Sequence, residues 1–411
     1  MNAQTLFYVI VAILVGQYLL DLLLEMLNKK NWSPTLPESL TGVYDEEKFE
    51  QHCSYRVVNH RFGLVYGFWG MAVMMAFLLL GGFAWLDGWV RSCTDQPILQ
   101  SLLFFGAILV GNNLLDLSFS YYQTFVVEGR FGFNKTTPKT FVLDVLKSAM
   151  LAIVLGIPLL SLVVWFHQVA GALFWLYALM AIGAFMLLMN LFYTSWILPL
   201  FNRLTPLPEG ELRQAIEQYS RAIGFKMADI YLMDGSRRST KANAFFSGFG
   251  PRKKIVLFDT LVNDLSTQEV VAVLAHEVGH YRLKHTLWGV VASLLQMAII
   301  LFLLGLVVNS PLMAEAVGVA NPSFYIGLTV FGMILTPVSL VASLLMNWLS
   351  RRNEFAADAF AAKTNSAEWL ASALKTISVK ALSNPTPHPV YVFFHYSHPP
   401  LLKRLEALEK R

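Results

Sequence analysis

The chain has 411 residues, of which 55% are hydrophobic and only 14% are charged, and its mean hydropathy is +0.52. This composition excludes an ordinary soluble protein and a disordered one, because apolar runs of about 18 residues or more are typical of membrane-spanning helices. The formal net charge of +4 is not accompanied by a basic and aromatic pattern that would bind nucleic acid, so no such partner is predicted.

Seven apolar runs predict seven membrane spans. They lie near residues 6–27, 64–86, 98–119, 142–165, 170–198, 286–308 and 324–349. The first run carries Asp21 and Glu25 and lacks a basic leader and a small-residue cleavage site. We therefore interpret it as a retained helix and not as a signal peptide.

The loops between these spans alternate in charge. Basic residues follow the first, third and fifth spans, for example Lys29 and Lys30 after the first. The other loops contain almost no basic residues, and Arg91 is the exception. The positive-inside rule then predicts an N-terminus outside and a cytoplasmic C-terminus. Cys53 and Cys93 would lie on opposite sides of the membrane and should not form a disulfide with each other.

Between the fifth and sixth spans, residues 199–285 are mixed polar and apolar. A proline-bounded turn and an amphipathic helix are followed by ADIYLMD and KKIVLFD, two runs typical of strands, with ANAFFSGFG between them. The predicted fold is an all-α membrane protein with a small α/β element. We divide it into 1–198, the element 199–285, 286–349 and 350–411.

The C-terminal region begins directly after the seventh span. NEFAADAFAAK is predicted to continue that helix, and TNSAEWLASALKTISVK to form another. HPVYVFFHYSHPP is predicted to be an irregular, proline-interrupted strip, and LLKRLEALEKR a last amphipathic helix.

The sequence VLAHEVGHYRLKH contains the pattern His-Glu-x-x-His. Ser266 and Glu269 precede it with the spacing of a capping box, so a helix should begin there. His276 and His280 would then share one helix face and could bind one zinc ion, with Glu277 able to reach a metal-activated water. Two surface histidines on an ordinary helix would be the alternative, but the motif and its cap favour a zinc site.

A catalytic zinc usually has three protein ligands and an open position. Glu354 is the best third candidate, and Asp358, one helical turn later, could hydrogen-bond a ligating imidazole. From spacing alone, both carboxylates could instead pair with Arg351 and Arg352 at the membrane surface.

Two further histidines have no ligand role from spacing alone. His285 lies off the ligand face, which favours a solvated or hydrogen-bonding histidine. His398 as a bare residue favours a structural role, although a donor near an oxyanion would suit a hydrolase. Gly279 would allow another backbone or a substrate to approach the motif.

Several polar residues interrupt the apolar spans, and they are costly against lipid. They are Asn112, Asn113, Asp116, Asn190 and Asn347. For any one of them, hydrogen bonding between helices is at least as good an explanation as an aqueous cavity. Together they favour a wet interior space.

Taken in order, HEVGH, SRRNEFAADAF and YSHPPLLKRL resemble the type I CAAX prenyl proteases, which are integral-membrane zinc endopeptidases. The resemblance extends over essentially the whole chain, including FVVEGRFGFNKTTPKTF (125–141), LPLFNRLTPLPEGEL (198–212) and ANAFFSGFGPRKKIVLFDTLV (242–262). The related HtpX-type membrane protease shares the zinc motif but is shorter and lacks a GFNKTTP segment.

The resemblance implies a role for each matching residue. One zinc ion per chain would be bound by His276, His280 and Glu354, with Glu277 as general base and Asp358 supporting a ligand. His398 would help to stabilise the tetrahedral intermediate, and Asn243 and Ala244 would belong to an edge strand that pairs with the substrate. The implied fold is a ring of seven tilted helices around a water-filled chamber.

The implied substrate is a peptide or protein, lipidated or otherwise tethered to the membrane, and no obligate protein partner is predicted. Phe245 stands where many eukaryotic members have Tyr. Any role of that hydroxyl would be absent here. The short sixth loop and the lack of a C-terminal ER-retrieval signal favour a bacterial cytoplasmic membrane, or the ER membrane if the source is eukaryotic. Alternatives are an HtpX-like quality-control protease and a non-enzymatic transporter or scaffold with a structural zinc.

Overall fold

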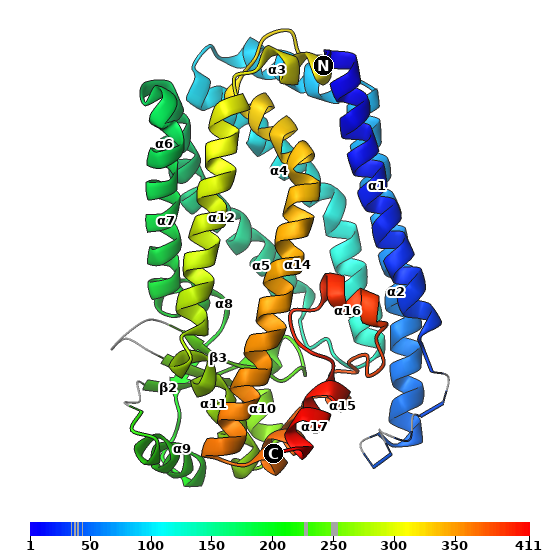
Figure 1. Ribbon diagram of the computed structural model, residues 1–411, viewed down its shortest axis with the longest axis vertical. Helices are drawn as coiled ribbons and strands as arrows, with labels where there is room; N and C mark the ends of the chain where they lie inside the picture. Colours follow the sequence, from blue (N-terminus) through cyan, green and yellow to red (C-terminus); the bar gives the residue numbers. More distant parts are fainter. Residues whose placement is uncertain (34, 37, 39–40, 43, 226–228, 248–253) are drawn as a thin grey trace.

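We describe the protein from a computed structural model, in residues 1–33, 35–36, 38, 41–42, 44–225, 229–247 and 254–411. Long helices run roughly side by side along the longest axis, and a small sheet with short helices lies at one end (Figure 1). The N-terminus lies at the opposite end from that sheet, and the C-terminus lies beside it.

Among the described residues, seven helical stretches are long and apolar enough to cross a membrane, which confirms the seven predicted spans. They comprise α1 (Ala3–Lys30); α2 (Glu46–Leu79); α4 (Pro97–Tyr121) with η2 (Tyr122–Glu128); α5 (Pro138–Leu151), η3 (Ala152–Gly156) and α6 (Ile157–Val169); η4 (Gly171–Leu173), α7 (Phe174–Phe192), η5 (Tyr193–Ile197) and α8 (Leu198–Phe201); α12 (His285–Val307); and α14 (Phe324–Thr364). Within three of these stretches the helix widens into a π-helical segment, in η2, η3 and η5.

Two helices extend well beyond their apolar runs. Helix α2 begins at Glu46, capped by the Asp45 side chain, although its apolar run begins near residue 64. Helix α14 continues for 41 residues and carries SRRNEFAADAF as an unbroken extension of the seventh span, as predicted. Since a span and a carboxylate-rich segment share one helix, the membrane part and the C-terminal region are rigidly connected.

At the end away from the sheet, α3 (Gly82–Cys93) and α13 (Pro311–Ala316) close the bundle (Figure 1). The Tyr325 hydroxyl donates to Asp87 Oδ1 at 2.6 Å, and Arg91 Nε donates to Asp87 Oδ2 at 2.9 Å. Asp87 and Tyr325 are both buried, so this end is held by charge-assisted hydrogen bonds.

The sheet has four strands in the order β1-β2-β4-β3. Strands β2 (Asp229–Met233) and β4 (Lys254–Phe258) are parallel, whereas β1 (Leu204–Pro206) pairs with β2 and β3 (Ala244–Ser247) pairs with β4 in antiparallel register. Both predicted strand runs are confirmed. Because β3 comes last in this order, it is at an edge of the sheet. The last three residues of ANAFFSGFG lie outside the described residues.

The remaining short helices belong to the segment between the fifth and sixth spans and to the C-terminal region. They are α9 (Glu211–Ala222), η6 (Gly235–Arg237), α10 (Asp259–Asp264), α11 (Thr267–Arg282), α15 (Ala367–Lys380), α16 (Pro389–His395) and α17 (Leu401–Glu409). The prediction of an irregular strip at 388–400 was partly wrong, because seven of its residues form α16. Proline at the first helical position starts that helix, since a missing N–H costs nothing there.

Candidate active site

Helix α11 carries the His-Glu-x-x-His motif. Its N-terminus is the predicted capping box: Ser266 Oγ accepts from the Glu269 N–H, and the Glu269 carboxylate accepts from the Ser266 N–H at 2.8 Å. The helix ends before Lys284, whose φ of 59° breaks the chain direction before α12 begins. The motif therefore lies on a helix fixed at both ends.

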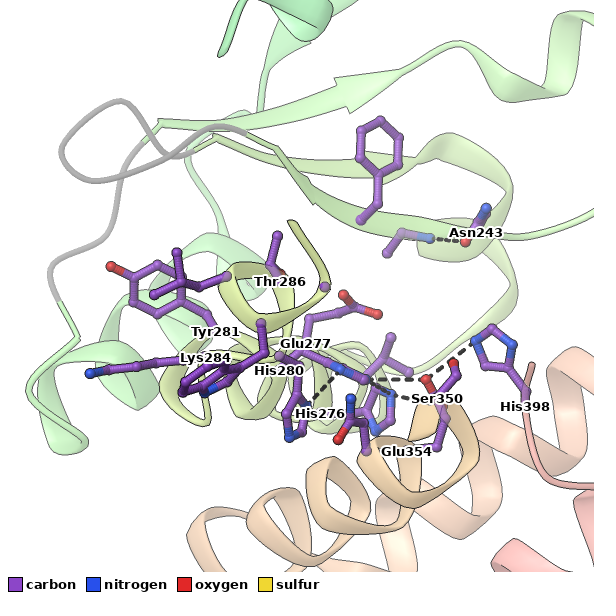
Figure 2. Close-up of a pocket in the computed structure, with 18 of the residues that line it drawn as sticks. Asn243, His276, Glu277, His280, Tyr281, Lys284, Thr286, Ser350, Glu354 and His398 are labelled. Carbon is purple, nitrogen blue, oxygen red and sulfur yellow. Dashed lines mark hydrogen bonds and ion pairs between the residues drawn. The ribbon is translucent and has the colours of Figure 1, made fainter. Parts of the chain in front are cut away.

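Three side chains converge between α11 and α14. The Nε2 atoms of His276 and His280 lie 3.2 Å apart, and the Glu354 carboxylate approaches them at 3.5 and 3.2 Å (Figure 2). One ligand atom from each residue lies within 4.8 Å of the others. The structure therefore brings the three predicted ligands together, and we call His276, His280 and Glu354 the ligand triangle.

The donor set fits a zinc ion. Two imidazole nitrogens and one carboxylate oxygen are the ligands of many catalytic zinc sites, which keep a fourth position open. The Glu354 Oε2 atom is buried and has no hydrogen-bond partner among the described residues. Because a buried carboxylate oxygen without a hydrogen bond is costly, this atom is suited to coordinate a cation.

Asp358 lies one turn beyond Glu354 and holds the other side of a ligand. Its Oδ1 atom is 2.8 Å from His276 Nδ1, which leaves Nε2 facing Glu354. The alternative pairing with Arg351 is wrong, because the Arg351 guanidinium donates to the carbonyls of Val392 and Tyr396 at 3.1 and 2.6 Å.

Arg404 on α17 is a site residue that the sequence interpretation did not single out. Its guanidinium donates to Asp358 in bidentate fashion, at 2.9 Å from Nε and 2.6 Å from Nη2, and its Nη1 lies 3.6 Å from Glu354 Oε2. Arg404 is 9% exposed. Its position four residues after Pro400, on a helix following the His398 strip, is the sequence signal that could have pointed to it.

His280 has a partner of its own beyond the ligand triangle. Its Nδ1 atom lies 3.1 Å from Nδ1 of His285, the first residue of α12. This contact agrees with the prediction of a hydrogen-bonding histidine at His285. The contact orients the His280 ring, as outer partners of metal ligands commonly do.

Glu277 is half-buried and points toward the space between α11 and the sheet (Figure 2). Burial raises the pKa of the Glu277 carboxyl; the cationic forms of His276 and His280 oppose this, whereas the Glu354 charge adds to it. The carboxyl lines a cavity of about 1740 Å³. A carboxylate beside a metal triangle and open to a cavity can take a proton from water.

The same cavity extends from the sheet to the membrane helices. His276, His280 and Glu354 lie on its wall together with Asn243 and Ala244 at the start of β3. Membrane-helix residues complete the lining, namely Phe185, Met186, Met189, Asn190, Trp288, Ala292 and Met346. Polar and apolar surfaces thus meet in one space.

His398 reaches the site from the turn between α16 and α17. Its Nε2 atom lies 3.3 Å from Glu354 Oε1, and its side chain is 64% exposed, directed toward the ligand triangle (Figure 2). Of the intramembrane polar residues, Asn347 supports this strip, since its Nδ2 donates to the Phe394 carbonyl at 2.8 Å. Cys53 and Cys93 are both free.

Asn243 and Ala244 open the edge strand. The Asn243 carbonyl accepts from the Phe258 N–H at 3.1 Å, and its side chain accepts from the Ala244 N–H at 2.8 Å. Phe245 also lines the cavity. One side of β3 is bound to β4, and the strand begins at the cavity that holds the ligand triangle.

This arrangement defines a class of protein, the metallopeptidases embedded in a membrane. Residues 25–203 match the family described as "CAAX prenyl protease N-terminal, five membrane helices", and residues 206–411 match peptidase family M48. The chain belongs to peptidase family M48 and is an integral-membrane metalloprotease. The alternative of a non-enzymatic transporter or scaffold is excluded by this membership.

Known proteins are similar to this chain over nearly its whole length. A CAAX prenyl protease 1 homolog of Arabidopsis thaliana is 36% identical over 394 residues, covering 92% of this chain and 91% of the relative. The human CAAX prenyl protease 1 homolog is 31% identical, covering 95% and 93%. The crystal structure of S. mikatae Ste24p matches with a TM-score of 0.93 and 32% identity, over 98% and 99% of the two chains. The predicted family and fold are confirmed.

Proposed function

We propose that this metalloprotease is a zinc endopeptidase that cleaves the C-terminal end of substrates carrying a prenyl group. The observation that carries the proposal is the shared cavity, in which the ligand triangle and apolar membrane-helix side chains line one space. The names of the relatives, CAAX prenyl protease 1, support the substrate class.

His276, His280 and Glu354 would hold the zinc. A bound zinc ion would act as a Lewis acid, which polarises the scissile carbonyl and lowers the pKa of water. Glu277 accepts the proton of the attacking water and delivers it to the leaving amine. His398 donates a hydrogen bond to the oxyanion that develops on the carbonyl oxygen.

Strand β3 would position the substrate backbone. An extended peptide can add to a free sheet edge by main-chain hydrogen bonds, and Asn243 and Ala244 mark where that edge meets the cavity. The lipid chain would pack against the apolar wall formed by Met186, Met189 and Trp288. Burial of such a chain contributes about 0.8 kcal/mol per CH₂ group.

The test compares a farnesylated CAAX peptide with the same peptide lacking the farnesyl group. Cleavage of the farnesylated peptide at a much higher kcat/KM supports the proposal. Equal cleavage of both peptides contradicts the prenyl specificity and favours a quality-control protease of the HtpX type. Met186→Ala and Trp288→Ala should raise KM for the farnesylated peptide more than for the bare one.

Glu277→Gln tests the general base separately. The amide cannot accept the water proton, so turnover should fall by about 10²–10⁴-fold, whereas the triangle of ligands is intact and zinc content stays at one per chain. Zinc is measured by atomic emission on the purified protein. A variant that cleaves at the normal rate would show that another group is the base.

We further propose that the N-terminus lies outside and the sheet and C-terminus lie in the cytoplasm. The supporting observation is that Lys and Arg follow the first, third and fifth apolar runs, for example Lys29 and Lys30 in the last turn of α1. Labelling of the two free cysteines from each side tests the orientation. The expectation of a bacterial source remains a prediction.

A further inference from the structure

A second cavity lies outside the active site, where α5 and α8 meet the segment 199–285. We call this segment, which holds the sheet and α11, the catalytic element. Its volume is about 400 Å³, and three basic residues line it: Lys147 of α5, Arg203 before β1 and Arg237 of η6. Leu200 and Phe201 supply apolar lining. The lining of this cavity therefore combines basic and apolar side chains.

These cations are not neutralised within the protein. Neighbouring basic side chains are paired: Arg238 with Asp144 at 2.8 Å, and Lys241 with Glu128 at 3.1 Å. Among the residues that the structure describes, the side chains of Arg203 and Arg237 have no acidic partner within 4.0 Å, and both residues are exposed. The positive charge of this cavity is thus available to a ligand.

The backbone fixes the two arginines relative to each other through Asp234. The Arg203 N–H donates to Asp234 Oδ1 at 2.7 Å, and the Asp234 N–H donates to the Arg203 carbonyl at 3.2 Å. The Arg237 N–H donates to the Asp234 carbonyl at 3.3 Å. The Asp234 carboxylate is thus hydrogen-bonded to the backbone of Arg203, and within the described part of the chain it forms no ion pair with the guanidinium of Arg203 or Arg237.

The cavity lies at the level where a span ends. Lys147 Nζ donates to the carbonyl of Leu200, near the end of the fifth span, at 2.7 Å. Trp196, four residues before Leu200, is 57% exposed, and aromatic side chains of this kind gather at membrane–water interfaces. On α5, Leu146 and Met150 beside Lys147 are exposed large apolar residues.

We propose that this cavity binds the phosphate of an anionic phospholipid headgroup, with Lys147, Arg203 and Arg237 around the phosphate and the acyl chains along α5 and α8. Basic cavities between membrane helices bind headgroups of this charge, and arginines bind phosphate through several N–H groups. The bound lipid connects α5 of the membrane part to η6 of the catalytic element.

The experiment measures the thermal stability of the full chain in neutral detergent while phosphatidylglycerol, phosphatidylcholine or inorganic phosphate is added. The test variant is Arg203→Gln with Arg237→Gln, which removes two exposed cations and leaves Lys147 in place. The matched control is Lys29→Gln with Lys30→Gln, which removes two cations at the end of α1. Zinc content and stability without lipid verify that each variant is folded.

Phosphatidylglycerol should stabilise the wild type and the control alike, and the test variant should bind it about 30-fold more weakly, at about 1 kcal/mol for each basic residue and 1.4 kcal/mol per tenfold. Arg203→Lys with Arg237→Lys should retain most of the effect. An equal response of the test variant, or an equal loss in the control, overturns the site. Equal protection by inorganic phosphate or by phosphatidylcholine overturns the anionic lipid as its ligand.

Discussion

Arg404 connects two carboxylates of α14 with the histidine motif of α11. Its two hydrogen bonds to Asp358 fix that carboxylate against His276 Nδ1, so the imidazole keeps Nε2 toward the ligand triangle. A planar guanidinium can make this bidentate contact, whereas an ammonium group acts as a point charge. We therefore infer that Arg404 positions the proposed ligand His276 and does not itself coordinate a metal.

Arg404→Lys should weaken zinc binding by about 10–100-fold, because partners of metal ligands contribute at this level. Competition with a zinc-selective chelator measures the affinity. Lys403→Gln is the matched control, because the Lys403 side chain, next to Arg404 in sequence, is exposed and pairs with Glu406. Unchanged zinc affinity in Arg404→Lys would contradict the positioning role.

At the scale of elements, the site depends on how closely α11 packs on α14. A Cβ atom placed on Gly279 would lie 3.1 Å from Ala357 Cα and 3.2 Å from Phe360 Cβ. Ala357 lies between Glu354 and Asp358 in sequence, so the glycine sets the distance from the histidines to both carboxylates. The expectation that Gly279 admits another backbone is confirmed, and that backbone is α14.

Gly279→Ala should therefore separate the two helices, lower the stability by about 1–3 kcal/mol and reduce zinc occupancy. Gly289→Ala on α12 is the control, because no atom lies within 4 Å of its added Cβ. Thermal unfolding and zinc content distinguish the two. If both variants retain full zinc, the close approach does not determine the ligand geometry.

At the scale of the whole molecule, the loop between η2 and α5 joins the membrane part to the catalytic element. The Lys135 N–H donates to the Arg238 carbonyl at 3.0 Å, and the Thr240 N–H donates to the Phe133 carbonyl at 3.1 Å. Arg238 also holds Asp144 of α5 through two hydrogen bonds of 2.8 and 2.9 Å. These contacts fix the segment that leads into the edge strand.

Asp144→Asn should raise KM for the peptide several-fold while zinc content stays constant, because the edge strand and not the ligand triangle loses its support. Asp144→Arg with Arg238→Asp should recover part of the loss. A double-mutant cycle measures the coupling, for which about 0.5–3 kcal/mol is expected. Strictly additive effects would show that the pair does not act as a unit.

By itself, the sequence determined the seven spans, the strand runs, the capped motif helix and the order of the proposed metal ligands. These features depend on local pattern: apolar runs for spans, helical spacing for His276 and His280, and a capping box for the start of α11. Only the tertiary structure decided which basic side chain pairs with the carboxylates of α14. Arg351 lies three residues from Glu354 in sequence but caps the α16 strip, whereas Arg404, fifty residues away, holds Asp358. The single cavity joining site and spans was likewise decided by packing, since helices that are distant in sequence form its walls.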